Sequence, residues 1–333
     1  MSGVIERTET LAPEPAYALG GVLGVEVPDL DNGAGLPLLW HWIYLLDHPA
    51  QADLGLDGHP ARGTVPAPPG PGRRRMWAGG RVRLSGPLRC GEPAARQTKV
   101  LSLTEKEGRT GRLTFVVVGH QISQRGQVIV DEEQDIVYRE AASTGAPAGA
   151  PAGVSASASG DEGPVVPAGD GEWEIEVSPT LLFRFSALTY NAHRIHYDRD
   201  YARDVEGYPG LLTHGPLQAI AMAEAARARG ADGGERYFEY RLISPLFDHQ
   251  GLIASAVPGE GLTATAVRDR YGRQTATGTL TLPRRPGRSL GVLNGAICRK
   301  GAPNHCGTLG GAPSVGQAGL ASRARLGSPR PGG

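Results

Sequence analysis

A strand followed by a Pro-Leu pair and a turn occurs twice in this chain of 333 residues, and this repeat limits the folds open to it. The segment RVRLSGPLRCGEP at 81–93 is echoed by YRLISPLFDHQGL at 240–252. TEKEGRTGRLTFVVV at 104–118 is likewise echoed by AVRDRYGRQTATGTLTL at 266–282, each with a Gly-Arg turn before a β-branched strand. The repeat predicts two copies of one α+β unit, with a chance likeness between ordinary hairpins as the alternative.

Two stretches rich in small residues divide the chain. Residues 142–169 are mainly Ala, Gly, Ser and Pro with little charge, a composition typical of a flexible linker. After residue 284 no sustained period of 2 or 3.6 is present, and we expect a disordered tail. The predicted organisation is therefore a first domain at 1–141, a linker at 142–169, a second domain at 170–283 and a tail at 284–333.

The element order is clearest in the second copy. GPLQAIAMAEAARARG at 215–230 predicts a helix, because Pro216 suits its first turn and Gly230 its end. Its first turns are apolar on most sides, which is typical of a buried helix. Strands are predicted around it at 172–178, 236–243, 252–257, 262–268 and 274–282. In the first copy, LPLLWHWIYLLDH at 36–48 is the candidate counterpart of the helix.

Composition excludes several classes of partner. Lys plus Arg equals Asp plus Glu at 34 each, so no net charge attracts nucleic acid or an anionic membrane. No window approaches the roughly 18 apolar residues of a membrane span. Three widely spaced cysteines, Cys90, Cys298 and Cys306, form no disulfide framework, and a cytoplasmic location is expected.

The segment TYNAHRIHYD at 189–198 concentrates the reactive side chains Asn191, His193, His196 and Asp198. Three interpretations are open: a metal site, a solvated loop, or an acid/base site. Structural zinc requires four ligands, which this loop alone does not supply. As an acid/base, a histidine takes a proton from water and returns one to carbon, while a nearby amide orients that water.

The start of the predicted helix is the second candidate. Gly215 lies where backbone N–H groups are unpaired and the helix dipole favours negative charge. Such a terminus can stabilise an oxyanion, although a simple glycine N-cap is the alternative.

These residues resemble the MaoC-like, hot-dog-fold family of enoyl-thioester hydratases and dehydratases. The family pattern A-L-S/T-x-D-x-N-P-x-H-x-D aligns with Ala187–Asp198, and its H-G-M-L aligns with His214–Leu217. The resemblance places the catalytic histidine at His196 and the oxyanion glycine at Gly215, with Asn191 at the position of the catalytic aspartate. LPLLWHW, RRMWAGGR and EEQDIVYRE extend it, over about residues 15–282, to the branch with two hot-dog units.

The resemblance implies a tandem hot-dog fold, each unit an antiparallel sheet around a central helix, packed as an internal pseudo-dimer with further homo-oligomerisation open. It implies a hydro-lyase without cofactor or metal, acting on acyl-CoA or acyl-carrier-protein thioesters, with short branched dicarboxylyl-CoA esters such as mesaconyl-CoA as one option. A hot-dog thioesterase and a non-catalytic acyl-thioester-binding subunit are the alternatives. Substrate contacts are expected from His193, Arg194, His214 and Trp77, and a core or tunnel wall from Trp40, His41, Trp42, Met76 and Trp77.

The amide at Asn191 cannot accept a proton at neutral pH, so the resemblance to a two-base mechanism is incomplete here. We therefore expect His196 to be the sole acid/base and Asn191 to orient water or the thioester. Arg194 is a candidate for binding a substrate carboxylate.

Overall fold

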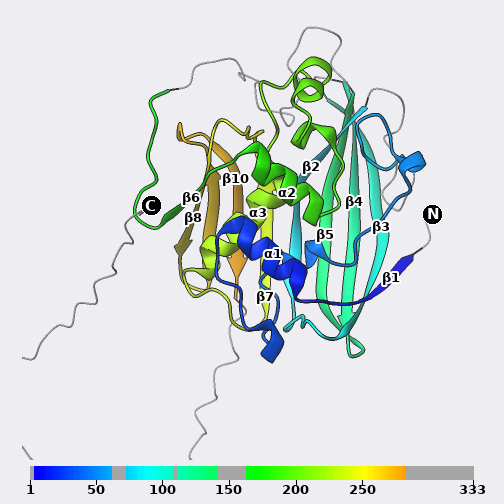
Figure 1. The fold of residues 1–333 in the computed structure, drawn as a ribbon, viewed down its shortest axis with the longest axis vertical. Helices are drawn as coiled ribbons and strands as arrows, with labels where there is room; N and C mark the ends of the chain where they lie inside the picture. The colour runs from blue at the N-terminus through cyan, green and yellow to red at the C-terminus, as the bar shows by residue number, and fades with distance from the viewer. Residues whose placement is uncertain (1–3, 62–72, 109–110, 141–162, 283–333) are drawn as a thin grey trace, which may run out of the picture. The chain divides into compact units, whose positions relative to one another are not determined.

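The computed structural model describes residues 4–61, 73–108, 111–140 and 163–282. Its strands form one antiparallel sheet in the order β1-β3-β4-β5-β2-β7-β10-β9-β8-β6 (Figure 1). The first half of the chain supplies β1 (Ile5–Thr10), β2 (Arg73–Leu84), β3 (Pro93–Gly108), β4 (Gly111–Gln124) and β5 (Gln127–Glu140). The second half supplies β6 (Glu172–Ile175), β7 (Arg236–Leu242), β8 (Leu252–Pro258), β9 (Leu262–Arg268) and β10 (Gln274–Thr281).

The strands β2 and β7 join the two halves, with Val82 opposite Phe238. A pair of glycines allows this junction. A Cβ on Gly79 would lie 2.4 Å from the Tyr240 carbonyl oxygen, and one on Gly80 would lie 2.5 Å from the Glu133 carbonyl oxygen. Only glycine permits this approach of three strands, which is accompanied by a register shift between Trp77 and Gly79.

The sequence repeat corresponds to a structural one. Each Pro-Leu segment follows a strand of the central junction, β2 in the first half and β7 in the second. The predicted Tyr271-Gly272 turn joins β9 to β10, with Gly272 at a φ of 85°. The predicted strands from 236 onward agree with β7 to β10 within a residue or so, whereas β6 ends three residues before its predicted end.

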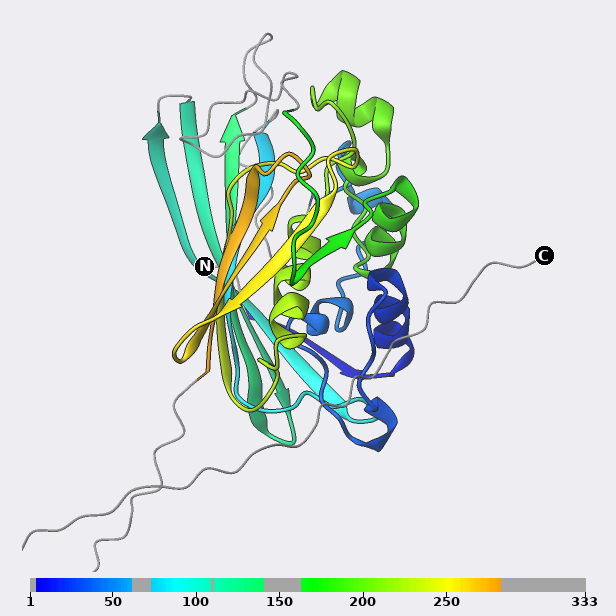
Figure 2. The same cartoon turned by 90° about the vertical axis from the view of Figure 1, so that its left-hand side faces the viewer.

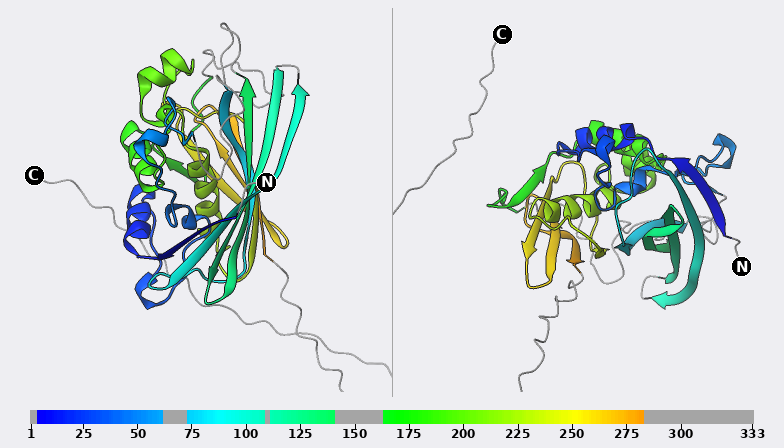
Figure 3. Two further views of the ribbon diagram at one scale, coloured as in Figure 1. Left: turned by 90° about the vertical axis from the view of Figure 1, so that its right-hand side faces the viewer. Right: turned by 90° about the horizontal axis from the view of Figure 1, so that it is seen from below.

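Three α-helices lie on one side of the sheet (Figures 2 and 3). They are α1 (Glu14–Leu23), α2 (Pro179–Leu188) and α3 (Gly215–Arg227). The buried helix α3 packs against β8, β9 and β10, and its alanines allow a close approach to the sheet. Helix α2 begins where Ser178 Oγ accepts a hydrogen bond from the Leu181 amide at 3.2 Å, and Pro179 follows at its first position. The antiparallel sheet with these helices agrees with the predicted α+β class.

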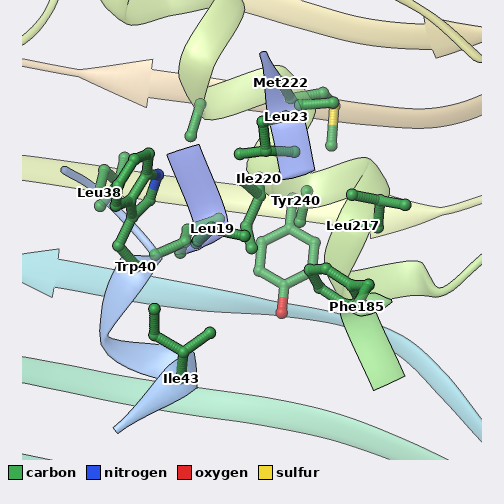
Figure 4. Packing of buried hydrophobic residues seen from close by; sticks show 14 of the residues in the cluster. Leu19, Leu23, Leu38, Trp40, Ile43, Phe185, Leu217, Ile220, Met222 and Tyr240 are labelled. Atoms are coloured by element: carbon green, nitrogen blue, oxygen red, sulfur yellow. The ribbon is translucent and has the colours of Figure 1, made fainter. Parts of the chain in front are cut away.

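The first half differs from the prediction at the counterpart of α3. The segment 36–48 is mostly buried as far as Leu45, but its regular part is only a 3₁₀ turn, Trp40–Ile43. Trp40 is fully buried and donates its indole N–H to Glu224 Oε1 of α3 at 2.9 Å, so this turn contributes to the core beside α3 (Figure 4). In the described residues of the first half, no α-helix fills the sheet as α3 does in the second.

Parts of the predicted organisation fall outside the described residues. They include most of the linker, through residue 162, and the tail from 284 onward. Residues 163–169 run along the second half, where the Arg268 guanidinium donates to the carbonyl oxygens of Val166 and Pro167 at 3.0 and 2.9 Å. Within the described ranges, no helix is both long and apolar enough to cross a bilayer.

Candidate active site

The loop after α2 positions Asn191. Tyr190 adopts a left-handed conformation, with a φ of 50°, and the backbone N–H of Asn191 then donates to the Ser186 carbonyl oxygen at 2.8 Å. Asn191 Oδ1 accepts a hydrogen bond from the His193 amide at 3.0 Å. This bond assigns the oxygen and leaves the side-chain NH₂ with no hydrogen bond to the described residues. Asn191 therefore offers donors, which suits an oxygen of water or of a thioester.

His196 follows in a 3₁₀ turn, Arg194–His196, and is buried. Its Nδ1 lies 2.7 Å from the Leu212 carbonyl oxygen. Because a carbonyl oxygen only accepts, Nδ1 carries the proton, and Nε2 of the neutral ring is the basic nitrogen. Burial lowers the pKa of His196 to about 4, although the bond to Leu212 acts in the opposite direction. The ring is therefore neutral, and able to accept a proton, at pH 7.

His214 stacks on His196 with ring centroids 3.7 Å apart and an interplanar angle of 17°. It is fully buried, its Nε2 lies 2.9 Å from Ser186 Oγ, and burial lowers its pKa well below the usual value. His214 is also the residue before α3, so the ring that stacks on His196 lies directly at the start of the helix.

Gly215 opens α3 and is partly exposed. No hydrogen bond to another described residue engages its backbone N–H, as expected in the first turn of a helix. A Cβ here would lie 2.3 Å from Leu242 Cδ1, so a larger residue would have to displace that side chain. Pro216 has no N–H, so Gly215 and Leu217 carry the unpaired donors of this first turn, and of these two residues Gly215 lines the cavity described below.

A cavity of about 920 Å³ brings most of the predicted residues together. Asn191, His193, His196, Gly215 and Trp77 all line it. His214 lies behind His196, outside the lining, so its position suits support of the ring more than contact with substrate.

Arg194 is the predicted site residue that points elsewhere, since it is absent from the cavity lining. Its guanidinium forms an ion pair with Asp198 at 2.7 Å, donates to the Leu56 carbonyl oxygen at 3.1 Å and lies 4.0 Å over the Tyr201 ring. These contacts commit its donors to holding the loop. A substrate carboxylate would have to compete with all of them.

The loop from Leu54 to Pro60 of the first half contacts the loop at 189–198, and nothing in the sequence signals this. The Arg194 amide donates to the Asp57 carbonyl oxygen at 2.9 Å, and the His59 and His193 rings lie 3.9 Å apart. Gly58 has a φ of 88°, and a Cβ there would lie 1.8 Å from the Ala192 carbonyl oxygen. Asp57 and His59 lie at an Asp-Gly-His turn whose sequence has no motif spacing relative to 189–198.

Ligand-type atoms of Asp57, His59 and His193 lie within 4.8 Å of one another, which invites comparison with a metal site. His59 Nδ1 lies 3.1 Å from Asp57 Oδ2, so two of the three groups already bond to each other. Arg75 lines the same cavity, and its positive charge lowers the pKa of His59, after the larger effect of burial. A cation would meet this charge. The set suits hydrogen bonding to an anionic or polar ligand better than it suits a metal ion.

A polar network lines the part of the cavity inside the first half. Glu132 accepts hydrogen bonds from Trp42 at 2.8 Å and Gln134 at 2.7 Å, and its Oε2 lies 2.8 Å from His41 Nε2. Burial is the largest single effect on the pKa of Glu132 and raises it, but the hydrogen bonds and charges of His41, His120 and Gln134 together outweigh burial and lower the pKa to about 2. His41, Trp42, Met76 and Trp77 line the cavity and Trp40 lies in the core, which agrees with the predicted wall and core roles.

Comparison with known proteins identifies the family. Residues 39–248 match the family of hydroxyacyl-thioester dehydratase type 2. The chain is 50% identical over 251 residues, 73% of its length, to mesaconyl-C(4)-CoA hydratase of Chloroflexus aurantiacus, of which 84% is covered. It is 40% identical over 82 residues to the mitochondrial hydroxyacyl-thioester dehydratase type 2 of Schizosaccharomyces pombe, covering 24% of this chain and 27% of the relative.

Solved structures confirm the fold. A MaoC-like dehydratase of Phytophthora capsici superposes with a TM-score of 0.59 at 16% identity, covering 84% of this chain and 95% of that one. HtdX of Mycobacterium tuberculosis superposes with a TM-score of 0.58 at 15% identity, covering 84% and 100%. The chain thus has the predicted double hot-dog fold, and it belongs to the hydroxyacyl-thioester dehydratase type 2 family of MaoC-like hydro-lyases.

Proposed function

We propose that this hydro-lyase adds water to a short 2-enoyl-CoA that carries a free carboxylate, or catalyses the reverse dehydration, with His196 as acid/base. The geometry of His196 carries the proposal. Its Nδ1 is held by the Leu212 carbonyl, and Nε2 has no hydrogen bond within the described part of the chain. His196 lines a cavity together with Asn191 and the first residue of α3.

In the hydration direction, His196 Nε2 accepts a proton from water as the water oxygen bonds to the β-carbon of the substrate. The π electrons of the double bond then move through the α-carbon to the thioester oxygen, forming an enolate. The imidazolium returns its proton to the α-carbon, and one molecule of water has been added. A histidine whose pKa is about 4 is a weak base but a strong acid once protonated, which favours this second transfer.

The enolate oxygen needs donors where its charge develops. The Gly215 N–H and the dipole of α3 supply them at the cavity wall. One such donor typically contributes about 10²–10³ in rate. The NH₂ group of Asn191 would orient the attacking water, because its Oδ1 is engaged by the His193 amide. His193 and Trp77, which both line the cavity, would contact the acyl group.

Two observations support a short, charged substrate. The hydratase that is 50% identical over most of this chain is named for the mesaconyl group, the acyl group of methylfumaric acid, linked to CoA through carbon 4. The wall in the first half also includes His41, Glu132 and Gln134 among apolar side chains, and these buried polar groups suit an acyl group with a polar end better than a purely hydrocarbon one.

We further propose that the chain divides functionally at the linker, with the two hot-dog units acting as an internal pseudo-dimer. The cavity is lined from both halves, so the pantetheine arm of CoA, or of a carrier protein, would pass between them. CoA is favoured as the carrier by the name of the same relative.

Purified protein incubated with mesaconyl-C(4)-CoA, crotonyl-CoA and a long-chain 2-enoyl-CoA tests the proposal. Loss of enoyl absorbance, fastest with mesaconyl-C(4)-CoA, is the expected result, and mass spectrometry should show a gain of one water. Release of free CoA thiol instead would indicate a thioesterase. Binding without turnover would indicate a non-catalytic subunit.

A further inference from the structure

We propose that Arg75, on β2 of the first half, binds the free carboxylate of the substrate and thereby determines the preference for a dicarboxylyl-CoA. This inference rests on the proposed function and names the residue that would recognise the distal acid. Arg75 lines the same cavity as His193 and His196. No prediction from the sequence singled it out.

The guanidinium of Arg75 is partly buried and has no matched partner. It forms no hydrogen bond or ion pair with any residue that the structure describes, although an arginine offers five N–H donors. Burial lowers its pKa, against the smaller opposing effects of Tyr138 and Asp57. A guanidinium stays charged in proteins all the same, so a desolvated cation faces the cavity without full compensation.

The carboxylate whose charge acts on Arg75, that of Asp57, is already engaged. Asp57 accepts hydrogen bonds from His59, with its Oδ1 3.0 Å from the backbone nitrogen and its Oδ2 3.1 Å from Nδ1. The His59 and His193 rings are kept largely neutral by burial, which lowers the pKa of each. Arg75 is therefore the cationic group beside these rings, and the neutral His193 ring offers one further N–H donor to a ligand.

The other arginines of the cavity wall are less suited to this role. Arg96 forms an ion pair with Asp47 at 2.8 Å. Arg241 is exposed to solvent, where a charge contact gains little. Arg194, the candidate from the sequence, lies outside the lining.

The chemistry of the substrate matches this position. In a mesaconyl thioester formed through carbon 4, the free carboxylate is bonded to the β-carbon, which is the carbon that receives water. A cation that binds it must therefore lie close to the acid/base. Arg75 lines the cavity together with His196, and its charge acts on His59 and on His193, whose ring centroid lies 5.5 Å from that of His196. A bidentate contact would also orient the β-carbon toward the attacking water.

Binding of two saturated esters separates this inference from catalysis. Methylsuccinyl-CoA retains the carboxylate of mesaconyl-C(4)-CoA, butyryl-CoA lacks it, and neither has a double bond to hydrate. Calorimetry on the full chain should give tighter binding of methylsuccinyl-CoA to the wild type. Arg75→Gln should weaken the binding of methylsuccinyl-CoA about 30-fold or more, as expected when one partner of a buried charge pair is removed. It should weaken the binding of butyryl-CoA less than about threefold. Arg75→Lys should recover part of the difference.

Arg241→Gln is the matched control, and it should change the affinity for both esters by the same factor. Arg75→Gln should also leave the free energy of unfolding unchanged or raise it, because an uncompensated buried charge is removed. If Arg75→Gln instead lowers the free energy of unfolding, Arg75 has a structural role. The binding comparison is then made with Arg75→Lys, which keeps the charge.

Equal affinity of the wild type for the two esters would contradict the inference, as would equal weakening of both in Arg75→Gln. The latter result would assign Arg75 to the CoA moiety. These outcomes do not depend on turnover. A chain that binds methylsuccinyl-CoA selectively but hydrates no enoyl-CoA would overturn the proposed function and leave the role of Arg75 intact.

Discussion

The second half of the sheet packs against a buried helix, whereas the first half lines an open cavity. In the second half, strands of four to eight residues pack against α3, a buried helix of 13 residues. In the first half, β2 to β5 have 12 to 16 residues, and a four-residue 3₁₀ turn lies where a helix was expected. Leu113, Phe115, Ile122 and Val137 of that sheet line the cavity instead.

Because of this difference, the candidate reactive groups lie in the second half, and much of the cavity wall lies in the first half. The second half has the proposed acid/base loop and the helix terminus, both of which depend on α2 and α3 being present. The first half has a wall of mixed polar and apolar side chains, the Arg75 cation and a loop that contacts residues 189–198. In the proposed mechanism, two copies of one supersecondary pattern therefore share a fold while one provides the reactive groups and the other most of the cavity wall.

The largest expected effect is a difference in kcat between substitutions of two buried histidines, His196 in the second half and His41 in the first. His196→Ala should reduce kcat by about 10²–10⁴, the usual contribution of a general acid/base. His41→Ala, in the first half, should leave kcat within about tenfold, because His41 bonds to Glu132 and lies in the wall. Asn191→Asp should retain substantial activity. Steady-state hydration of the enoyl-CoA checks all three, and unchanged turnover in His196→Ala would end its assignment.

The pH dependence of stability should also differ between His196 of the second half and Glu132 of the first half. The pKa of His196 is lowered to about 4, against about 6.5 in an unfolded chain, so the unfolded state binds more protons between these values. Stability from this group is complete above pH 6.5 and falls by about 3 kcal/mol as the pH drops to 4. For Glu132, with a pKa of about 2, the corresponding loss lies between pH 4.5 and 2.

Urea unfolding from pH 7.5 to 3 measures this dependence. His196→Asn should flatten the upper part of the profile and Glu132→Gln the lower part. A profile of His196→Asn that matches the wild type between pH 6.5 and 4 would contradict the assigned neutral state.

Substitutions of two buried glutamates, Glu132 and Glu224, should change the free energy of unfolding by smaller amounts and in different directions. The pKa of Glu132 is lowered, so its charged form is stabilised by its partners in the first half. The pKa of Glu224, on α3, is raised by burial despite Arg227 and Trp40, so its charge is poorly compensated. Glu132→Gln should cost about 2 kcal/mol of unfolding free energy, whereas Glu224→Gln should be neutral or stabilising. Chemical denaturation at pH 7 distinguishes them, and equal losses would show that the pKa directions are wrong.

The smallest effect tests the contact between the halves. Gly58→Ala places a Cβ against the Ala192 carbonyl and should displace the catalytic loop, with kcat falling about tenfold. Gly126→Ala is the control, since Gly126 has a φ of 75° but open space around it. If both variants lose the same activity, the backbone conformation and not the contact is responsible.

Local patterns determined much of the second half. The apolar and alanine-rich run from Gly215, with Pro216 inside it, predicted α3 because helix signals are short-range. Alternation predicted β7 to β10 for the same reason, and the loop at 189–198 with Gly215 indicated the site and the family. These features depend on neighbours within a few residues along the chain.

What only the tertiary structure decided depends on distant contacts. The mostly apolar segment 36–48 has the composition of a helix, but packing beside α3 leaves a 3₁₀ turn and an open cavity. The tautomer of His196 depends on the Leu212 carbonyl, 16 residues away. Asp57, His59 and Arg75 reach the site across more than a hundred residues, and no spacing in the sequence encodes that approach. Burial then removes the solvent that would otherwise compensate Arg75, which is why an ordinary arginine in sequence becomes a candidate anion site in the fold.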